Sequence, residues 1–221
     1  MRFLTPHDRR VRRRRRLLLA AAFLLGLIVL TLLDRAIFEA LRVADRPRLE
    51  RRDWYQFLRA LGYAPTWIAV GAVLIACDAA ARRMHAARPA HAARRGALTI
   101  LGALLGGGLA ELLKVVVARQ RPINNGVADG AYVWGYPFEA LAGGGNYGLA
   151  SSHAGVAFGA AFVLARVAPG SGWVLIPLAI GCGVSRLLTG AHFATDVYVA
   201  AWLSGVIAAA LCGRFGEGRA A

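Results

Sequence analysis

Apolar residues fall along the chain in six long runs, which polar or basic segments separate. The runs lie at about residues 17–33, 65–81, 97–118, 153–168, 172–186 and 193–213. Most of them approach the ~20 residues with which an α-helix crosses the hydrocarbon core of a bilayer, although the fifth run is short. The pattern therefore predicts an all-α protein that folds as a six-span transmembrane helical bundle.

A basic segment precedes the first apolar run. Residues 9–16, RRVRRRRR, are followed by the apolar residues 17–33 and then by DRAIFEA. A basic region before an apolar one is also typical of a secretory signal peptide, but this run is long and no small-residue cleavage site follows it. We therefore expect a retained first transmembrane helix whose N-terminus lies in the cytoplasm.

The segment at 34–63 is mixed in charge and has amphipathic spacing, with aromatic residues at Trp54, Tyr55 and Phe57. Segments of this kind lie at headgroup level, so we predict one or two interfacial helices here. The chain then divides into a basic cytoplasmic tail, a first helix with its interfacial segment, a membrane core and a C-terminal tail. These parts cover residues 1–16, 17–63, 64–213 and 214–221.

Composition agrees with a membrane protein. The chain has 221 residues, of which 57% are hydrophobic, which suffices for one bundle but not for a second sizeable domain. The formal net charge is +15, and the arginines gather at the ends of the apolar runs. This placement favours anionic lipid headgroups over nucleic acid as the partner, although a GC-rich genome would also give many arginines.

The distribution of charge among the loops predicts the topology. With a cytoplasmic N-terminus, the basic loop at 82–95 is also cytoplasmic, as the positive-inside rule expects. The segments 34–63, 119–150 and 187–192 then lie together on the opposite side. The rule is only partly satisfied, because 34–63 also carries many arginines, which acids largely balance.

Three polar clusters fall on that opposite side, and the last of them is the most informative. The stretch SRLLTGAHFATD at 185–196 contains Arg186, His192 and Asp196. His192 and Asp196 are four apart and would share one face of a helix. A carboxylate can hold one imidazole nitrogen protonated and leave the other free to attack, while an arginine suits phosphate oxygens. The alternative is a polar turn in which His192 is merely hydrogen-bonded.

The first cluster is Lys114 followed by Arg121-Pro122 at the end of the third run. Pro122 disfavours helix at Arg121, so we expect the helix to end there, with both cations on one face about two turns apart. They could converge on one anion or simply snorkel to the membrane surface. Lys114, the only lysine in the chain, could instead pair with Glu111.

The second cluster is Ala150-Ser151-Ser152-His153, which opens the fourth run. Backbone N–H groups at a helix N-terminus bind anions, Ser151 adds a hydroxyl and His153 can donate a proton. Alternatively, the serine could simply be the N-cap of a helix and the histidine could have no catalytic role.

Together these clusters resemble the signature of the type 2 phosphatidic acid phosphatase and vanadium haloperoxidase superfamily, in its integral-membrane lipid phosphatase branch. The family's motifs K-x6-RP, PSGH and SR-x5-H-x3-D correspond here to Lys114…Arg121-Pro122, Ala150-Ser151-Ser152-His153 and Ser185-Arg186…His192…Asp196. The resemblance covers roughly residues 60–213. The second motif departs from the pattern, because Ala150 replaces proline and Ser152 replaces glycine. We expect this to affect rate and substrate fit more than reaction type.

The resemblance implies a phosphatase that acts through a phosphohistidine and needs no metal or other cofactor. In it His192 is the nucleophile, Asp196 orients the imidazole and His153 protonates the leaving group. The groups that hold the phosphoryl oxygens are then Lys114, Arg121, Ser151, Ser152 and Arg186.

The clusters fall near headgroup depth, so we expect a lipid phosphate or diphosphate in the outer leaflet of a bacterial inner membrane. Phosphatidic acid, phosphatidylglycerol phosphate, undecaprenyl diphosphate and lipid A-like substrates all fit, and the sequence indicates no oligomeric state. The loop at 119–150 carries aromatic residues that could form an interfacial lid or ordinary membrane anchors. They are Tyr132, Trp134, Tyr136, Phe138 and Tyr147.

Other functions fit parts of the pattern. A phosphotransferase, a phosphatase of small soluble esters or a vanadate-dependent haloperoxidase could use the same site. A non-catalytic membrane or lipid-transport protein is a further alternative, but all three motifs keep their charged residues.

Overall fold

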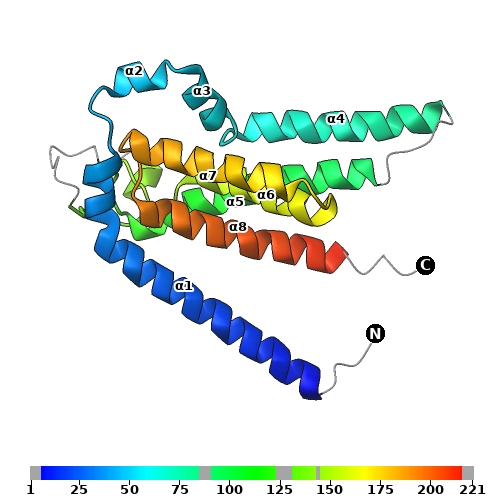
Figure 1. Cartoon of the computed structure of the whole chain (residues 1–221), viewed down its shortest axis with the longest axis horizontal. Helices are drawn as coiled ribbons and strands as arrows, with labels where there is room; N and C mark the ends of the chain where they lie inside the picture. The colour runs from blue at the N-terminus through cyan, green and yellow to red at the C-terminus, as the bar shows by residue number, and fades with distance from the viewer. Residues whose placement is uncertain (1–5, 85–90, 123–130, 143–144, 216–221) are drawn as a thin grey trace.

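The computed structural model describes residues 6–84, 91–122, 131–142 and 145–215, and most of these residues are helical (Figure 1). The helices are α1 (Pro6–Leu41), α2 (Arg46–Glu50), α3 (Asp53–Ala60), α4 (Ala64–Arg83), α5 (Ala92–Val117), η1 (Glu139–Ala142), α6 (Ser152–Val167), α7 (Gly172–Leu188) and α8 (Ala194–Phe215). Within the described residues, β-pairing is limited to two isolated bridges, which join residues 119 and 120 to later parts of the same loop. The prediction of an all-α protein is confirmed.

Four of these helices are long and apolar enough to cross a membrane. They are α1, α4, α5 and α8. Two more apolar helices, α6 and α7, have 16 and 17 residues. Each predicted apolar run is therefore helical, while a crossing of the membrane by all six stays a prediction.

The centre of the bundle is the pair α5 and α6, with α4 packed against α5 and with α7 and α8 packed against α6 (Figure 1). Two glycine pairs bring the central helices together. A Cβ atom added to Gly102 would lie 2.6 Å from the carbonyl oxygen of Gly159, and one added to Gly155 would lie 2.4 Å from that of Gly106. Small residues four apart allow this backbone approach.

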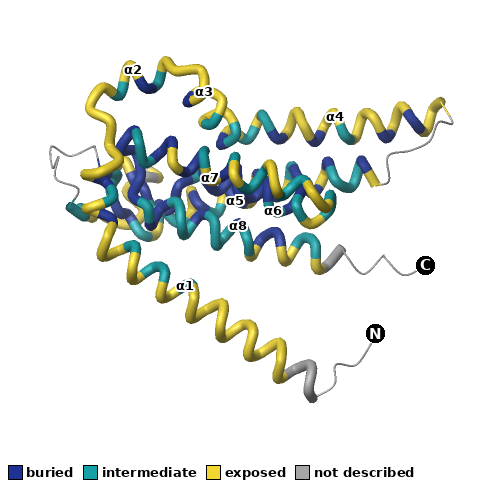
Figure 2. The backbone as a smooth tube through the Cα atoms, viewed as in Figure 1, coloured by how far each residue is buried: buried dark blue, intermediate teal, exposed yellow. Residues whose placement is uncertain are grey.

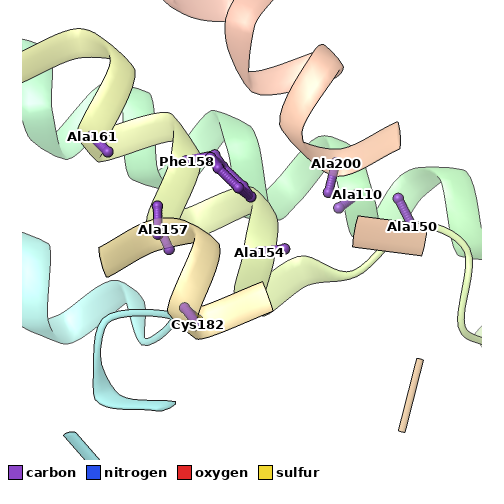
Figure 3. Packing of buried hydrophobic residues seen from close by; sticks show 9 residues of the cluster. Ala110, Ala150, Ala154, Ala157, Phe158, Ala161, Cys182 and Ala200 are labelled. Atoms are coloured by element: carbon purple, nitrogen blue, oxygen red, sulfur yellow. The ribbon is translucent and has the colours of Figure 1, made fainter. Parts of the chain in front are cut away.

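Small side chains also fill the core next to the polar clusters (Figure 3). Phe158 of α6 is the only large side chain in this cluster of buried residues, whose other members are alanines and Cys182. One of the alanines, Ala150, lies in the loop just before α6 and is fully buried. Tight packing of small residues therefore draws the start of α6 towards α5, α7 and α8.

Helix α1 begins at Pro6 and so includes the basic run at 9–16, which the sequence analysis places in a tail before the first helix. It is exposed along most of its length and contacts the bundle mainly through α8 and α7 (Figure 2). The predicted segment at 34–63 forms the end of α1 and the short helices α2 and α3, of which α3 packs on α7. Tyr55 of α3 is fully buried there.

Candidate active site

The third cluster forms a tight turn between α7 and α8. Gly190 has φ +65°, a conformation that favours glycine, and the N–H of Ala191 donates to the carbonyl of Arg186. His192 lies in this turn, so the expectation that it shares a helix with Asp196 is wrong. The two side chains still meet, because Asp196 reaches back to the backbone N–H of Phe193 at 2.9 Å in the manner of a capping box.

His192 and Asp196 form a buried pair, with Nδ1 of the imidazole 3.1 Å from Oδ2 of the carboxylate. An ionised carboxylate only accepts hydrogen bonds, so Nδ1 carries the proton and Nε2 keeps a free lone pair. Burial is the main reason that the pKa of His192 falls to about 4. Arg121 and Lys114 act in the same direction, while Asp196 opposes them. His192 is therefore neutral near pH 7 and can act as a nucleophile.

The first cluster departs from the expected geometry. Helix α5 ends at Val117 rather than at Arg121, because Ala118 adopts a left-handed conformation with φ +53°. Lys114 and Arg121 therefore do not share a helix face. The loop turns Arg121 back instead, with its N–H on the carbonyl of Asn146 and its Nε on that of Tyr147. The charges of Lys114 and Arg121 both act on His192.

Lys114 joins the first cluster to the second. Its Nζ donates to Glu111 at 2.7 Å and to Oγ of Ser152 at 3.0 Å. The side chain of Lys114 is 7% exposed, whereas that of Glu111 is 60% exposed. The predicted alternative partner Glu111 is therefore present, and it holds a buried ammonium at the start of α6.

Ser151 joins the second cluster to the third. It is the N-cap of α6, with its Oγ accepting from the N–H of Ala154 at 3.4 Å, as the alternative interpretation expected. Its own N–H donates to the carbonyl of Asp196 at 3.1 Å. The three motifs are thus bonded to one another through Lys114–Ser152 and Ser151–Asp196.

Three buried side-chain nitrogens of this site have no hydrogen-bond partner within the described part of the chain. They are Nε2 of His153, Nε of Arg186 and Nε of Arg119, a residue between Lys114 and Arg121. The charges of Arg186, His192 and Lys114 all act on His153, and that of Arg121 acts on Arg186. Donors and cations that converge in this way suit a phosphate group.

Two contacts of the site involve residues that the sequence did not single out for chemistry. Tyr55 of α3 accepts a hydrogen bond from Nη1 of Arg186 at 3.1 Å. Arg119, one of the residues between Lys114 and Arg121, is buried and donates to Asp196 and to Thr195. The family motif accepts any residue at the position of Arg119. What sets Arg119 apart from the other arginines is its burial, which depends on tertiary contacts and cannot be read from the sequence.

A further missed residue is Asp34 of α1, which is almost fully buried and accepts from Thr195. Its position just after the apolar run at 17–33 was a usable signal, because an ionisable residue at membrane depth is expensive and often functional.

The aromatic residues of the loop at 119–150 fall into two groups. Tyr132 donates to Asp34 at 2.7 Å, and Tyr147 is buried and donates to Glu139 at 2.6 Å. The others are exposed, namely Trp134, Tyr136 and Phe138. Residues 123–130 of this loop, with the NNG sequence, lie outside the described residues, so the lid stays a prediction.

The sequence model of the PAP2 superfamily matches residues 95–217, more than half of the chain. The chain belongs to the PAP2 superfamily. In the same comparisons no curated protein and no solved structure matches it. The matched region contains all three clusters of this PAP2 chain and excludes α1 to α4.

A groove opens beside the PAP2 site, with a volume of about 480 Å³. It lies between the start of α4, the middle of α5 and the start of α6. Glu111, Ser152 and His153 are among its lining residues, and most of the others are small or apolar. Gly62 lets the turn before α4 approach, since an added Cβ would lie 2.7 Å from Cβ of His153.

Among the described residues, no group of three or more His, Cys, Asp or Glu side chains is placed to hold a metal ion. The site is instead built from cations, hydroxyls and two imidazoles. This set can bind a phosphoryl group, offer a nucleophilic nitrogen and supply a proton.

Proposed function

We propose that the protein is an integral-membrane lipid phosphatase that works through a phosphohistidine. The observation that carries this proposal is the buried His192–Asp196 pair beside two donors with no protein partner, His153 Nε2 and Arg186 Nε. Membership of the PAP2 superfamily implies phosphatase activity and supports it.

In the proposed mechanism Nε2 of His192 attacks phosphorus, and the bond from phosphorus to the leaving oxygen breaks. His153 donates its Nε2 proton to that oxygen, so the product leaves as an alcohol or as a phosphate. Lys114, Arg121 and Arg186 stabilise the charge on the three remaining oxygens. Water, deprotonated by His153, then attacks the phosphohistidine, which restores His192 and releases inorganic phosphate.

The groove beside His153 supports a lipid substrate. In the proposed mechanism His153 protonates the oxygen of the leaving group. His153 also lines the groove, so a lipid chain attached to that oxygen can enter the groove. A volume of about 480 Å³ lined by small and apolar residues accommodates part of an acyl or prenyl chain, and each buried CH₂ contributes about 0.8 kcal/mol. Phosphatidic acid-, undecaprenyl diphosphate- and lipid A-like substrates share this chemistry.

We further propose that α6 and α7 cross the membrane with the other four helices, in a bacterial inner membrane. The site would then face the outside and the N-terminus the cytoplasm. Trp134→Cys, made in a chain whose three native cysteines are replaced, should react in whole cells with a maleimide that cannot cross the membrane. Reaction only after lysis would contradict the orientation.

The activity is tested by phosphate release from purified protein in mixed micelles. Long-chain lipid phosphates should be cleaved with a higher kcat/KM than a soluble aryl phosphate. Activity should survive EDTA and be inhibited competitively by vanadate, which can adopt the geometry of the transferring phosphoryl group. A requirement for added magnesium, or better cleavage of the soluble ester, would contradict the proposal.

A further inference from the structure

A chain of buried hydrogen bonds runs behind Asp196, on the side away from His192. Nη2 of Arg119 donates to Oδ1 of Asp196 and, at 2.7 Å, to Oγ1 of Thr195. Thr195 in turn donates to Asp34 of α1 through its hydroxyl and, at 3.0 Å, through its N–H. Tyr132 donates to the same carboxylate at 2.7 Å. The chain therefore connects α1 to the candidate nucleophile.

Two aromatic rings pack against the guanidinium of Arg119. Its Cζ lies 4.7 Å from the centre of the Tyr132 ring and 5.1 Å from that of Phe193, both within cation–π range. Arg119 is also buried, so a substrate does not reach it. Asp34 receives three donors, which suits an ionised carboxylate. Burial and the neighbouring Asp34 raise the pKa of Tyr132 to about 12, so its hydroxyl stays protonated.

We propose that Arg119 and Asp34 are positioning residues for the reaction, and that α1 completes the site although it lies outside the family match at 95–217. Arg119 fixes one oxygen of Asp196 so that the other meets Nδ1 of His192. Asp34 in turn fixes Thr195 and balances the charge of Arg119, because a buried cation shared by two carboxylates is less costly than an unbalanced one. The inference rests on the proposed role of His192.

The test uses the pH dependence of kcat/KM in purified full-length protein. The charged and titratable groups that act directly on His192 are Asp196, Arg121, Lys114 and His153. Arg119 acts on Asp196 and on Asp34, so both residues of the proposal reach His192 through Asp196. Removing the Arg119 cation should raise the pKa of His192 and move the acid limb to higher pH. Removing the Asp34 anion should move the limb to lower pH. A purely structural role would not give opposite shifts.

The variants are Arg119→Met and Asp34→Asn. Each should lower kcat by about 10–100-fold, as loss of a group that orients a reacting residue does, while KM changes by less than about threefold. Arg119→Lys should restore the wild-type position of the acid limb. Glu39→Gln is the matched control for Asp34, because Glu39 lies on the same helix and is half exposed.

The inference would be overturned if the acid limbs of Arg119→Met and Asp34→Asn stayed at the wild-type pH, or if both moved in the same direction. If Arg119→Met does not fold, Arg119→Lys and Tyr132→Phe carry the test, since both keep the packing and alter one contact of the chain. Wild-type kcat in both would overturn it as well. Inactive wild-type protein would instead contradict the proposed function.

A different observation, at the opposite end of the molecule, carries a second inference. A cavity of about 730 Å³ lies between α1, α6 and α8. α1 diverges from α8 towards its N-terminus at this end (Figure 1). Leu19, Phe162, Trp202 and Val206 are among its apolar lining residues. The basic lining residues are Arg12, Arg15, Arg16 and Arg166, and none of the acids whose side chains the structure describes lines it.

Tyr198, which also lines the cavity, donates to the carbonyls of Ala22 and Phe23 at 3.2 Å and stacks on the Phe23 ring. Along α1, the lining arginines lie about one membrane leaflet from this contact. From Arg12 to Phe23, helix α1 rises about 16 Å. Half of a hydrocarbon core is about 15 Å. An acyl chain that starts at the arginines would therefore end near Tyr198.

We infer that this cavity binds an anionic phospholipid of the leaflet opposite the active site, with its phosphate among the arginines. Basic pockets between transmembrane helices take such headgroups. A second copy of the chain fits less well, because a symmetric contact through the same face would bring two sets of four arginines together.

The test is native mass spectrometry of the detergent-purified protein with added phosphatidylglycerol or phosphatidylcholine. Combined Arg15→Gln, Arg16→Gln and Arg166→Gln should weaken phosphatidylglycerol binding on the order of a hundredfold, since each basic residue contributes about fivefold. The control combines Arg10→Gln, Arg13→Gln and Arg14→Gln, on the same helix but outside the lining. Equal binding of phosphatidylcholine, equal loss in the control, or a dimer in place of bound lipid would overturn the inference.

Discussion

Nδ1 of His192 lies 3.1 Å from Oδ2 of Asp196, and both side chains are buried. We therefore expect His192→Ala to lower phosphate release by roughly 10⁴-fold or more, because the nucleophile itself is lost. Asp196→Asn should cost about 10²–10⁴-fold, since an amide can hold the imidazole in the wrong tautomer. The loss of activity is measured as the rate of phosphate release at a saturating concentration of lipid phosphate. The phosphohistidine is measured as acid-labile, base-stable labelling of the protein by ³²P-labelled substrate.

His91→Ala and Asp53→Asn are the controls for this pair, because both residues are exposed and lie outside the site. All four proteins should elute as the wild type does in detergent. Near-normal phosphate release from a well-folded His192→Ala variant would eliminate the proposed nucleophile.

The pH dependence of activity should reflect the unusual state of His192. Burial lowers the pKa of His192 to about 4, so the lone pair of Nε2 is free above that pH and becomes protonated below it. The acid limb of kcat/KM should therefore lie near pH 4, well below that of an ordinary histidine at about 6.5. At alkaline pH kcat should fall, when His153 of the enzyme–substrate complex loses the proton that a bound phosphate dianion helps it to keep.

A profile from pH 3.5 to 9 measures both limbs. Protein held at each pH and then assayed at pH 7 shows whether a limb is reversible titration or loss of structure. Activity that rises steadily through pH 9, or an acid limb near pH 6.5, would contradict these roles.

The sequence yields candidates for the reactive residues because each proposed chemical role needs one residue type at a fixed spacing. Lys114, His153 and His192 were selected in this way, and their roles stay predictions. It did not predict where α5 ends, because the left-handed Ala118 belongs to a loop whose bridges join Arg119 to Trp134 and Gln120 to Tyr147.

Contacts between distant parts of the chain were equally hidden. Asp34 and Thr195 meet across 161 positions, and Arg119 and Asp196 across 77. No local pattern links such residues, since the packing of α1, α5 and α8 brings them together. The resemblance to a family did not reveal them either, because Asp34 precedes the matched region at 95–217.

The departure from the family pattern at Ser152 has a structural role. Its Oγ accepts from Nζ of Lys114 at 3.0 Å, so it holds a cation that binds phosphate in the proposed mechanism. Ser152→Ala should raise KM by about 2–10-fold, the usual range for one hydrogen bond, with kcat little changed. Ser152→Gly should bind substrate more tightly than Ser152→Ala, because a Cβ no longer crowds the phosphate. Initial rates over a range of lipid phosphate concentrations measure both, and wild-type KM in both would show that the hydroxyl does not position Lys114.

The groove beside His153 can be filled without disturbing the fold. Gly108 of α5 lines it, and a Cβ added there would meet no atom within 4 Å. Replacement of a glycine within a helix also favours the helix by up to about 1 kcal/mol, so Gly108→Leu should fold at least as well as the wild type. We expect this variant to lower kcat/KM for long-chain lipid phosphates by about tenfold, the cost of excluding roughly two CH₂ groups from the groove. The value for a short-chain or soluble phosphate ester should stay within about twofold.

Gly213→Leu on α8 is the matched control, because a Cβ there also meets no atom and the residue lies outside the groove. Equal losses for long and short substrates in Gly108→Leu would show that the chain leaves the site by another route.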